Sequence, residues 1–319
     1  MEKLLEVKDL KVSFFTDLGE TQAVKGAGFA IGEGDFFGIV GESGSGKSVT
    51  TKSILRLGPS NCKIMGGEIL FRGEDILKKN EAELREIRGG EIAMIFQDSL
   101  SALNPVYTVG NKMVELIRRH TNMNKKEAKA RVLELLTAVG ITDPEKAMNS
   151  YPHELSGGMQ QRVMIAMAMS SDPKVLIADE PTTALDVTIQ AQILHLLLEL
   201  QKKNNMSIIL ITHDLGVVAQ TCKRVAVMCG GYVVEEGTVE EIFLHPGHPY
   251  TQALIASMPR VGGTFEQFLE RDLSDGNGDL CPFLNRCKYA DKTCEACLPK
   301  YYEASEGHRI FCHRREEKR

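Results

Sequence analysis

Residues 41–48 read Gly-Glu-Ser-Gly-Ser-Gly-Lys-Ser, and this stretch decides which fold we expect. It matches G-x-x-x-x-G-K-[ST], follows the apolar run FFGIV and precedes a helix-like stretch, KSVTTKSILRL. Glycines let successive backbone N–H groups turn toward an anion, and the helix that follows adds the positive end of its dipole. Lys47 supplies a charge for the β- and γ-phosphates, and Ser48 supplies a hydroxyl for Mg²⁺. The stretch therefore predicts a P-loop that binds ATP through Gly41, Ser43, Gly44, Ser45, Gly46, Lys47, Ser48 and Val49.

A second apolar run, VLIADE at residues 175–180, ends in two carboxylates. A buried strand that brings Asp179 to the edge of the sheet would provide a second Mg²⁺ ligand beside Ser48. The next residue, Glu180, is placed to orient or deprotonate the water that attacks the γ-phosphate. An Asp-Glu pair after an apolar run is usually a strand end that meets solvent, but the P-loop upstream favours the catalytic interpretation.

The stretch LSGGM at residues 155–159 predicts a second anion site. Ser156 is a typical N-cap, and the backbone N–H groups of Gly157 and Gly158 begin a helix without side chains in the way. One chain does not need two γ-phosphate sites for one nucleotide. We therefore predict that Ser156, Gly157 and Gly158 serve a nucleotide held by another copy; the alternative is an ordinary capped helix.

The layout of the chain indicates an α/β protein. Continuous apolar runs at 36–40, 175–179 and 207–212 are typical of a sheet covered on both faces. Helical periodicity predominates between about 99 and 172, which predicts a helical subdomain inserted into the core. We expect a nucleotide-binding domain over 1–258 and a small Cys-rich extension over 259–319.

Composition limits the class of function. The 319 residues are 43% hydrophobic and 25% charged, and no apolar run reaches the length of a membrane-spanning helix. The first ten residues have no apolar signal core, so nothing suggests export. The net charge of −5 argues against nucleic acid as a partner, because phosphate binding needs a basic face.

The order LSGGM, with the P-loop before it and VLIADEP after it, resembles the nucleotide-binding subunits of ABC transporters over about residues 4–237. The resemblance implies a P-loop NTPase fold that works in pairs at the cytoplasmic face of the cell membrane, with two separate transmembrane permease subunits. It also implies a catalytic set and further ATP or Mg²⁺ contacts. These are Glu180, His213, Gln97 and Lys47 for catalysis, Ser48, Gln97 and Asp179 for Mg²⁺, Asp186 across the dimer interface, and Phe14 (less favoured, Phe15) stacked on adenine.

Two longer phrases narrow the resemblance. YPHELSGGMQQRV at 151–163 and HPGHPYTQALIASMP at 245–259 resemble the peptide and nickel import branch. This implies ATP-driven uptake of di- or oligopeptides, delivered by an extracellular binding protein. The alternatives are a nickel importer of the same branch, or a soluble ABC ATPase that takes no part in transport. We interpret His245 and His248 as loop residues, since nothing in the sequence gives them a metal partner.

Five cysteines crowd into the last 39 residues, spaced C-x5-C-x6-C-x2-C-x14-C. In a reducing compartment such thiolates favour Zn²⁺ or an iron–sulfur cluster, and the spacing is typical of neither. The subfamily resemblance implies a [4Fe–4S] cluster held by Cys281, Cys287, Cys294 and Cys312, with Zn²⁺ as the alternative and Cys297 outside the set. We expect ATP hydrolysis to survive loss of this site, because every catalytic residue named above precedes Gly237.

Overall fold

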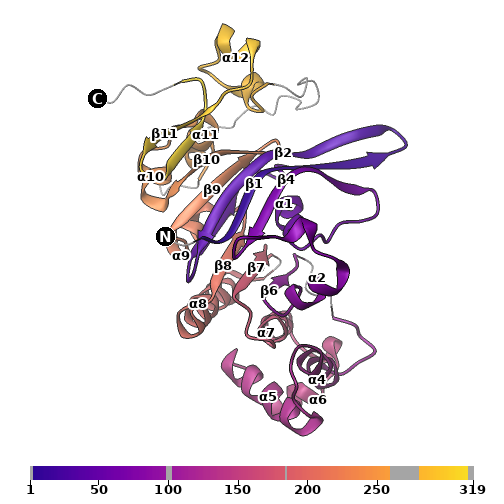
Figure 1. Cartoon of the computed structure of the whole chain (residues 1–319). Coiled ribbons are helices and arrows are strands. Elements are labelled where there is room, and N and C mark those ends of the chain that lie inside the picture. Colours follow the sequence, from indigo (N-terminus) through magenta and orange to yellow (C-terminus); the bar gives the residue numbers. More distant parts are fainter. Residues whose placement is uncertain (1–2, 98–102, 184, 259–279, 315–319) are drawn as a thin grey trace.

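Two β-sheets and the helices around them form the framework of the protein (Figure 1). The computed structural model describes residues 3–97, 103–183, 185–258 and 280–314. The larger sheet has eight strands in the order β11 (Tyr301–Ser305), β12 (His308–Phe311), β10 (Tyr232–Thr238), β9 (Arg224–Cys229), β3 (Phe36–Val40), β8 (Ser207–Ile211), β7 (Val175–Asp179) and β6 (Ile92–Ile95). Strands β9, β3, β8, β7 and β6 are parallel neighbours, and each side chain of β3, β7 and β8 is buried. The α/β core predicted from the apolar runs is confirmed.

A four-stranded antiparallel sheet covers one face of the larger sheet. Its order is β2 (Gly19–Gly32), β1 (Lys3–Thr16), β4 (Cys62–Phe71) and β5 (Glu74–Asp75). Because side chains alternate along a strand, Phe37 and Ile39 of β3 pack with this small sheet, whereas Phe36 and Val40 pack on the opposite face. Helix α1 (Lys47–Ile54) lies in the same layer, since its Ile54 belongs to the cluster of Phe37 and Ile39.

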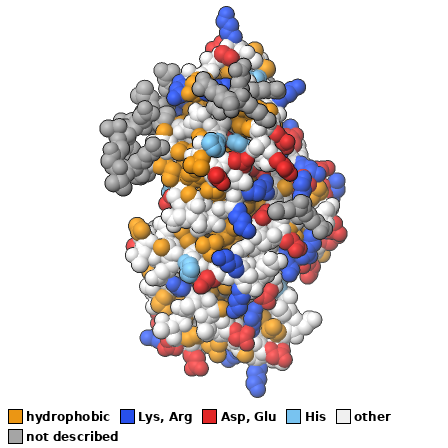
Figure 2. Space-filling view, turned by 90° about the vertical axis from the view of Figure 1, so that its left-hand side faces the viewer, with side chains coloured by type: hydrophobic (Ala, Val, Ile, Leu, Met, Phe, Trp, Pro, Cys, Tyr) orange, Lys and Arg blue, Asp and Glu red, His pale blue; other side chains and the backbone are white. Residues whose placement is uncertain are grey.

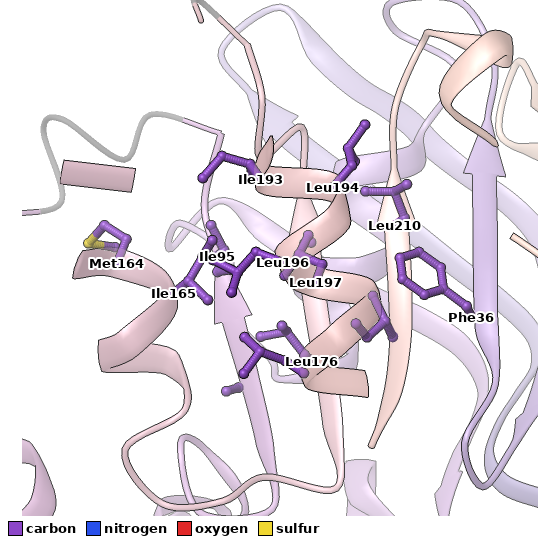
Figure 3. Packing of buried hydrophobic residues seen from close by; sticks show 14 of the residues in the cluster. Phe36, Ile95, Met164, Ile165, Leu176, Ile193, Leu194, Leu196, Leu197 and Leu210 are labelled. Carbon is purple, nitrogen blue, oxygen red and sulfur yellow. The ribbon is translucent and has the colours of Figure 1, made fainter. Parts of the chain in front are cut away.

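Helices cover the opposite face of the larger sheet. Helix α8 (Val187–Asn204) places Leu196 and Leu197 between the strands and helix α7 (Gly157–Ala168), as Figure 3 shows. Leu176 of β7, Leu210 of β8 and Ile165 of α7 contribute to the same cluster. This layer buries Leu176, Ile165 and Leu197 completely, so it fixes how α7 and α8 lie on the strands that carry the P-loop and the Asp-Glu pair.

The described residues of the predicted helical insertion are mostly helical. They form α4 (Val109–His120), α5 (Lys125–Ala138), α6 (Pro144–Asn149), the 3-10 turn η2 (Pro152–Glu154) and α7. Thr108 caps α4, and Asn124 and Glu127 form a reciprocal capping box at the start of α5. The first residues of the predicted range, 99–102, lie outside the described part of the chain.

Short elements complete the fold: η1 (Ile76–Lys78), α2 (Glu81–Ile87), α9 (Leu215–Thr221), α10 (Val239–Leu244), α11 (Pro249–Ala256), η4 (Leu284–Arg286) and α12 (Lys292–Ala296). The last two strands extend the main sheet, since β12 pairs with β10 and β11 pairs with β12. The domain boundary predicted at residue 259 falls at the edge of the undescribed residues 259–279, so it stays a prediction.

Two surface properties bear on function. None of the helices that the structure describes is long and apolar enough to span a membrane. Figure 2 shows one face of the molecule, on which acidic and basic side chains are interspersed. That face does not have the concentrated positive charge that a nucleic-acid backbone needs.

Candidate active site

The P-loop joins the buried strand β3 to helix α1, as the sequence predicts. Gly41 has a φ of +153°, and a Cβ at this position would lie 2.2 Å from the carbonyl oxygen of Met228. Gly46, at the N-cap of α1, has a φ of +98°, and a Cβ there would lie 2.7 Å from the carbonyl oxygen of Ala23. Both positions therefore require glycine, because no side chain fits between the loop and its neighbours.

The ammonium group of Lys47 is held over the loop. Its Nζ donates hydrogen bonds of 2.8 Å to the carbonyl oxygens of Gly41 and Glu42. Burial lowers the pKa of Lys47, while the negative charges of Glu180 and Asp179 oppose that shift. The Lys47 ammonium therefore lies in the electrostatic field of Glu180 and Asp179, the two predicted catalytic and Mg²⁺-binding carboxylates.

Ser48 and Asp179 form the predicted magnesium-side pair. The Ser48 hydroxyl donates to Asp179 Oδ1 at 2.8 Å, and Asp179 is fully buried at the end of β7. Burial raises the pKa of the Asp179 carboxyl, and its Oδ2 has no hydrogen-bond partner among the described residues. A hydroxyl and a carboxylate with a free buried oxygen are the hard ligands that Mg²⁺ prefers, so this pair fits the ion.

Glu180 is the centre of a second cluster. Its Oε2 accepts hydrogen bonds from Gln97 Nε2 at 2.8 Å and Thr183 Oγ1 at 2.9 Å, and its Oε1 lies 3.4 Å from His213 Nδ1. Glu180 has a φ of +47°, which is unusual for a residue with a side chain and marks a strained position. The structure therefore brings Gln97, Glu180 and His213 together from three separate segments. Thr183 is a member of the cluster that the sequence analysis missed.

Phe14 lines a groove together with Ser48, Val49 and Lys52 of α1. Phe15, the less favoured alternative, does not line this groove, and Lys63 Nζ lies 5.2 Å from the centroid of its ring.

The residues predicted to act on a second copy's nucleotide lie at helix starts. Ser156 is the N-cap of α7 and accepts from the backbone N–H of Met159 at 3.4 Å. Asp186 is the N-cap of α8 and accepts from Ile189 at 3.0 Å. In the part of the chain that the structure describes, no hydrogen bond joins Ser156 or Asp186 to Lys47 or Glu180. Gly157 and Gly158, which follow Ser156, face α8 and its preceding turn.

The four cysteines of the predicted cluster line one small cavity. Cys281, Cys287, Cys294 and Cys312 share it with His248 and Phe283. Burial raises the pKa of the Cys281 thiol to about 11. Among the described residues, however, no group of three or more His, Cys, Asp or Glu side chains has the arrangement that would hold a metal ion. The four thiols therefore line a common cavity without forming such a group.

Cys297, which was expected outside the ligand set, does not line this cavity, although its Sγ lies 3.9 Å from Nε2 of His313, which does. His248, interpreted as a loop residue, directly precedes α11 as its N-cap. It is 1% exposed, and its Nδ1 accepts from the backbone N–H of Tyr250 at 3.0 Å. A single histidine between prolines carried no sequence signal for this burial.

Comparison with known proteins agrees with this geometry. A model of the ABC transporter family matches residues 24–183, and a model of the oligopeptide/dipeptide transporter C-terminal region matches residues 234–294. The dipeptide transport ATP-binding protein DppD of Bacillus subtilis (strain 168) is 49% identical over 319 residues, which cover 98% of this chain and 95% of that protein. The oligopeptide transport ATP-binding protein OppD of the same organism is 51% identical over 316 residues, covering 97% and 88%.

Solved structures lead to the same family. The ATP-binding cassette MJ0796, in a dimeric post-hydrolysis state bound to ADP and Pi, matches with a TM-score of 0.66 at 30% identity. The match covers 74% of this chain and 98% of that one. With the P-loop, the Ser48–Asp179 pair and the Glu180 cluster in place, these matches show that the chain belongs to the ABC transporter family, as one of its ATP-binding and ATP-hydrolysing subunits.

Proposed function

We propose that this protein hydrolyses ATP to power the uptake of di- and oligopeptides through two separate permease subunits. The observation that carries the proposal is the pairing of a complete hydrolytic cluster around Glu180 with a C-terminal region of the oligopeptide/dipeptide transporter type. The relatives named for dipeptide and oligopeptide transport support peptides over nickel. We place the protein at the cytoplasmic face of the membrane, supplied with cargo by an extracellular binding protein.

Each polar residue of the site has a role that follows from its placement. The P-loop N–H groups and Lys47 bind the β- and γ-phosphates, and the Phe14 ring stacks on adenine beside Val49. Ser48 and Asp179, with Gln97, would hold Mg²⁺, which neutralises charge on the phosphates.

Hydrolysis then needs an oriented water. The Glu180 carboxylate, fixed by Gln97 and Thr183, accepts the proton of the attacking water, and His213 contacts the γ-phosphate. Gln97 donates a hydrogen bond to Glu180. A permease subunit that displaced the segment after Gln97 would therefore shift Gln97 and move the Glu180 carboxylate out of line with the attacking water. This link offers a route by which transport and hydrolysis are coupled.

We further propose that the chain works in pairs. Ser156, Gly157 and Gly158 present backbone N–H groups and a hydroxyl at the start of α7, and Asp186 lies at the start of α8. These groups fit a γ-phosphate bound by a second ATPase subunit, identical or related. Among the described residues, neither Ser156 nor Asp186 is hydrogen-bonded to Lys47 or Glu180 of the same chain. The pair would close on ATP and open after hydrolysis.

The cysteine cavity supports a further, more specific proposal. Cys281, Cys287, Cys294 and Cys312 would hold a [4Fe–4S] cluster, or alternatively Zn²⁺, after their side chains turn toward one centre. Their common cavity and the exclusion of Cys297 from it support this ligand set. Such a site would stabilise a segment that is short of apolar side chains.

Peptide uptake tests the main proposal. Cells that lack their own peptide importers would receive the complete transporter with either the wild-type chain or the Glu180→Gln variant. We expect ATP-dependent accumulation of a labelled dipeptide or pentapeptide only with the wild-type chain. Uptake of radioactive nickel in the same cells, without peptide uptake, would favour the nickel alternative. Hydrolysis without uptake of either cargo would favour an ATPase outside transport.

A further inference from the structure

Glu42, the second residue of the P-loop motif, is tied to the rest of the protein at three points. Its backbone N–H donates to the hydroxyl of Tyr250 at 2.9 Å. Its carbonyl oxygen accepts from Lys47 Nζ at 2.8 Å. Its carboxylate accepts two hydrogen bonds of 2.8 Å from the guanidinium of Arg286, one to each oxygen. This bidentate arrangement fixes both the position and the orientation of the carboxylate.

One of these contacts comes from the C-terminal segment 280–314, through Arg286, and another comes from α11, through Tyr250. Arg286 ends η4, directly before Cys287, and its guanidinium lies 5.3 Å from the ring centroid of Phe283. The same Phe283 ring packs edge-on against Tyr250, with centroids 5.4 Å apart. Phe283 is 3% exposed, so one buried ring supports both groups that hold Glu42.

A second path joins this segment to the P-loop independently of Arg286. Pro282 packs so closely on Gly230 that a Cβ on Gly230 would lie 2.6 Å from the Pro282 Cβ. The adjacent Gly231 donates its N–H to the carbonyl oxygen of Ser45 at 3.0 Å. The cysteine-bearing segment therefore contacts the P-loop directly at Glu42 and reaches Ser45 indirectly, through Gly230 and Gly231.

We propose that Arg286 is a positioning residue for the nucleotide site, through which the C-terminal segment fixes the P-loop. Arg286 acts by neutralising Glu42 and by holding its peptide group, whose carbonyl oxygen in turn holds Lys47. Without Arg286, an uncompensated carboxylate lies in the loop that must accept the negative phosphates of ATP. The loss of Arg286 affects nucleotide binding rather than the chemical step, because in the described part of the chain Arg286 is hydrogen-bonded to Glu42 and not to Glu180 or His213.

The expectation that ATP hydrolysis survives loss of the cysteine site stays a prediction, and it concerns the thiols rather than Arg286. The Glu42–Arg286 pair spans 244 positions and makes the tail part of the support of the site.

The test compares Arg286→Ala with the double variant Arg286→Ala/Glu42→Gln in the full transporter and in the full-length chain. For Arg286→Ala we expect the KM for ATP, and the Kd for a fluorescent ATP analogue, to rise about 10-fold, with kcat within about twofold. The double variant removes the uncompensated charge, so it should regain most of the affinity. Arg286→Lys keeps the charge without the bidentate geometry and should lie between the wild type and Arg286→Ala.

Arg309→Ala is the matched control. Arg309 lies in the same C-terminal segment and pairs with the buried Glu236, but it contacts no P-loop residue among those described. We expect its nucleotide Kd to stay within about twofold of the wild-type value. The proposal fails if Arg309→Ala weakens nucleotide binding as much as Arg286→Ala, if Arg286→Ala lowers kcat alone, or if the double variant binds no better than the single one. If Arg286→Ala does not fold, the nucleotide Kd of Arg286→Lys is compared with that of Arg309→Lys. A rise in Kd for Arg286→Lys alone supports the proposal, and equal values contradict it. Peptide uptake enters none of these measurements, so the outcome is independent of the cargo.

Discussion

Replacing Glu180 by glutamine exchanges one carboxylate oxygen for an amide group and leaves the size of the side chain unchanged. Oε2 accepts from both Gln97 and Thr183, whereas His213 is the one hydrogen-bonding neighbour of Oε1 among the described residues. An amide that keeps its oxygen at the Oε2 position retains both accepted hydrogen bonds and turns its NH₂ group toward the ring of His213. The architecture of the cluster should therefore survive, and the substitution removes the base alone.

The expected loss of kcat follows from removing the base while keeping the hydrogen bonds of the cluster. Loss of a general base lowers kcat by roughly 10²–10⁴-fold, which corresponds to about 3–5 kcal/mol in the activation free energy. The phosphate contacts come from the P-loop and Lys47, so the Kd for ATP should change by less than about threefold. Single-turnover release of phosphate measures the first quantity, and equilibrium binding of a fluorescent ATP analogue measures the second.

Lys47→Ala is the contrasting variant in the same assays. It removes the ammonium that Gly41 and Glu42 hold over the loop, so it should weaken ATP binding itself. Turnover close to the wild-type rate in Glu180→Gln would refute the assignment of the base. A loss of ATP affinity as large as that of Lys47→Ala would show instead that Glu180 is a structural member of the site.

Three further predictions concern other parts of the chain. Ser156→Arg should leave the ATP affinity of the dilute monomer unchanged and should block hydrolysis and ATP-dependent dimer formation, the latter measured by light scattering. A large loss of ATP affinity in the monomer would mean that the start of α7 acts on the nucleotide of its own chain. Anaerobically purified protein should be brown if the cluster is present. Cys297→Ser should keep that colour and Cys287→Ser should lose it. Colourless protein with one tightly bound zinc ion would contradict the [4Fe–4S] assignment. Gly41→Ala should destabilise the fold by about 1–3 kcal/mol in denaturant unfolding, because its Cβ would overlap the Met228 carbonyl; unchanged stability would show that the loop shifts freely.

Much of the site was predictable because its parts are local in sequence. A P-loop needs a strand, a turn with glycines at fixed offsets and a helix start, and all of these lie within residues 36–54. The same applies to the apolar strand that ends at Asp179 and to Ser156 at the start of α7. Parallel strands that end at the same edge of a sheet bring their terminal residues together, which is why Ser48 meets Asp179 across 131 positions.

What the tertiary structure alone decided involves contacts that no local pattern encodes. Thr183 donates to Glu180 across a turn in which the Glu180 backbone has a left-handed conformation, which the residue type disfavours. His248 is buried where its backbone N–H donates to Glu235 of β10, 13 positions earlier.

The bidentate contact between Arg286 and Glu42 is likewise a tertiary contact that no local sequence pattern predicts. Glu42 lies in the P-loop and Arg286 directly precedes Cys287, but no spacing in the sequence links two residues that are 244 positions apart. By itself, the sequence determined the nucleotide site and its family, because that chemistry needs particular residues at short, fixed spacings. The link between the cysteine segment and the P-loop was decided only by packing, because Phe283 must be buried and its position in the fold places Arg286 against Glu42.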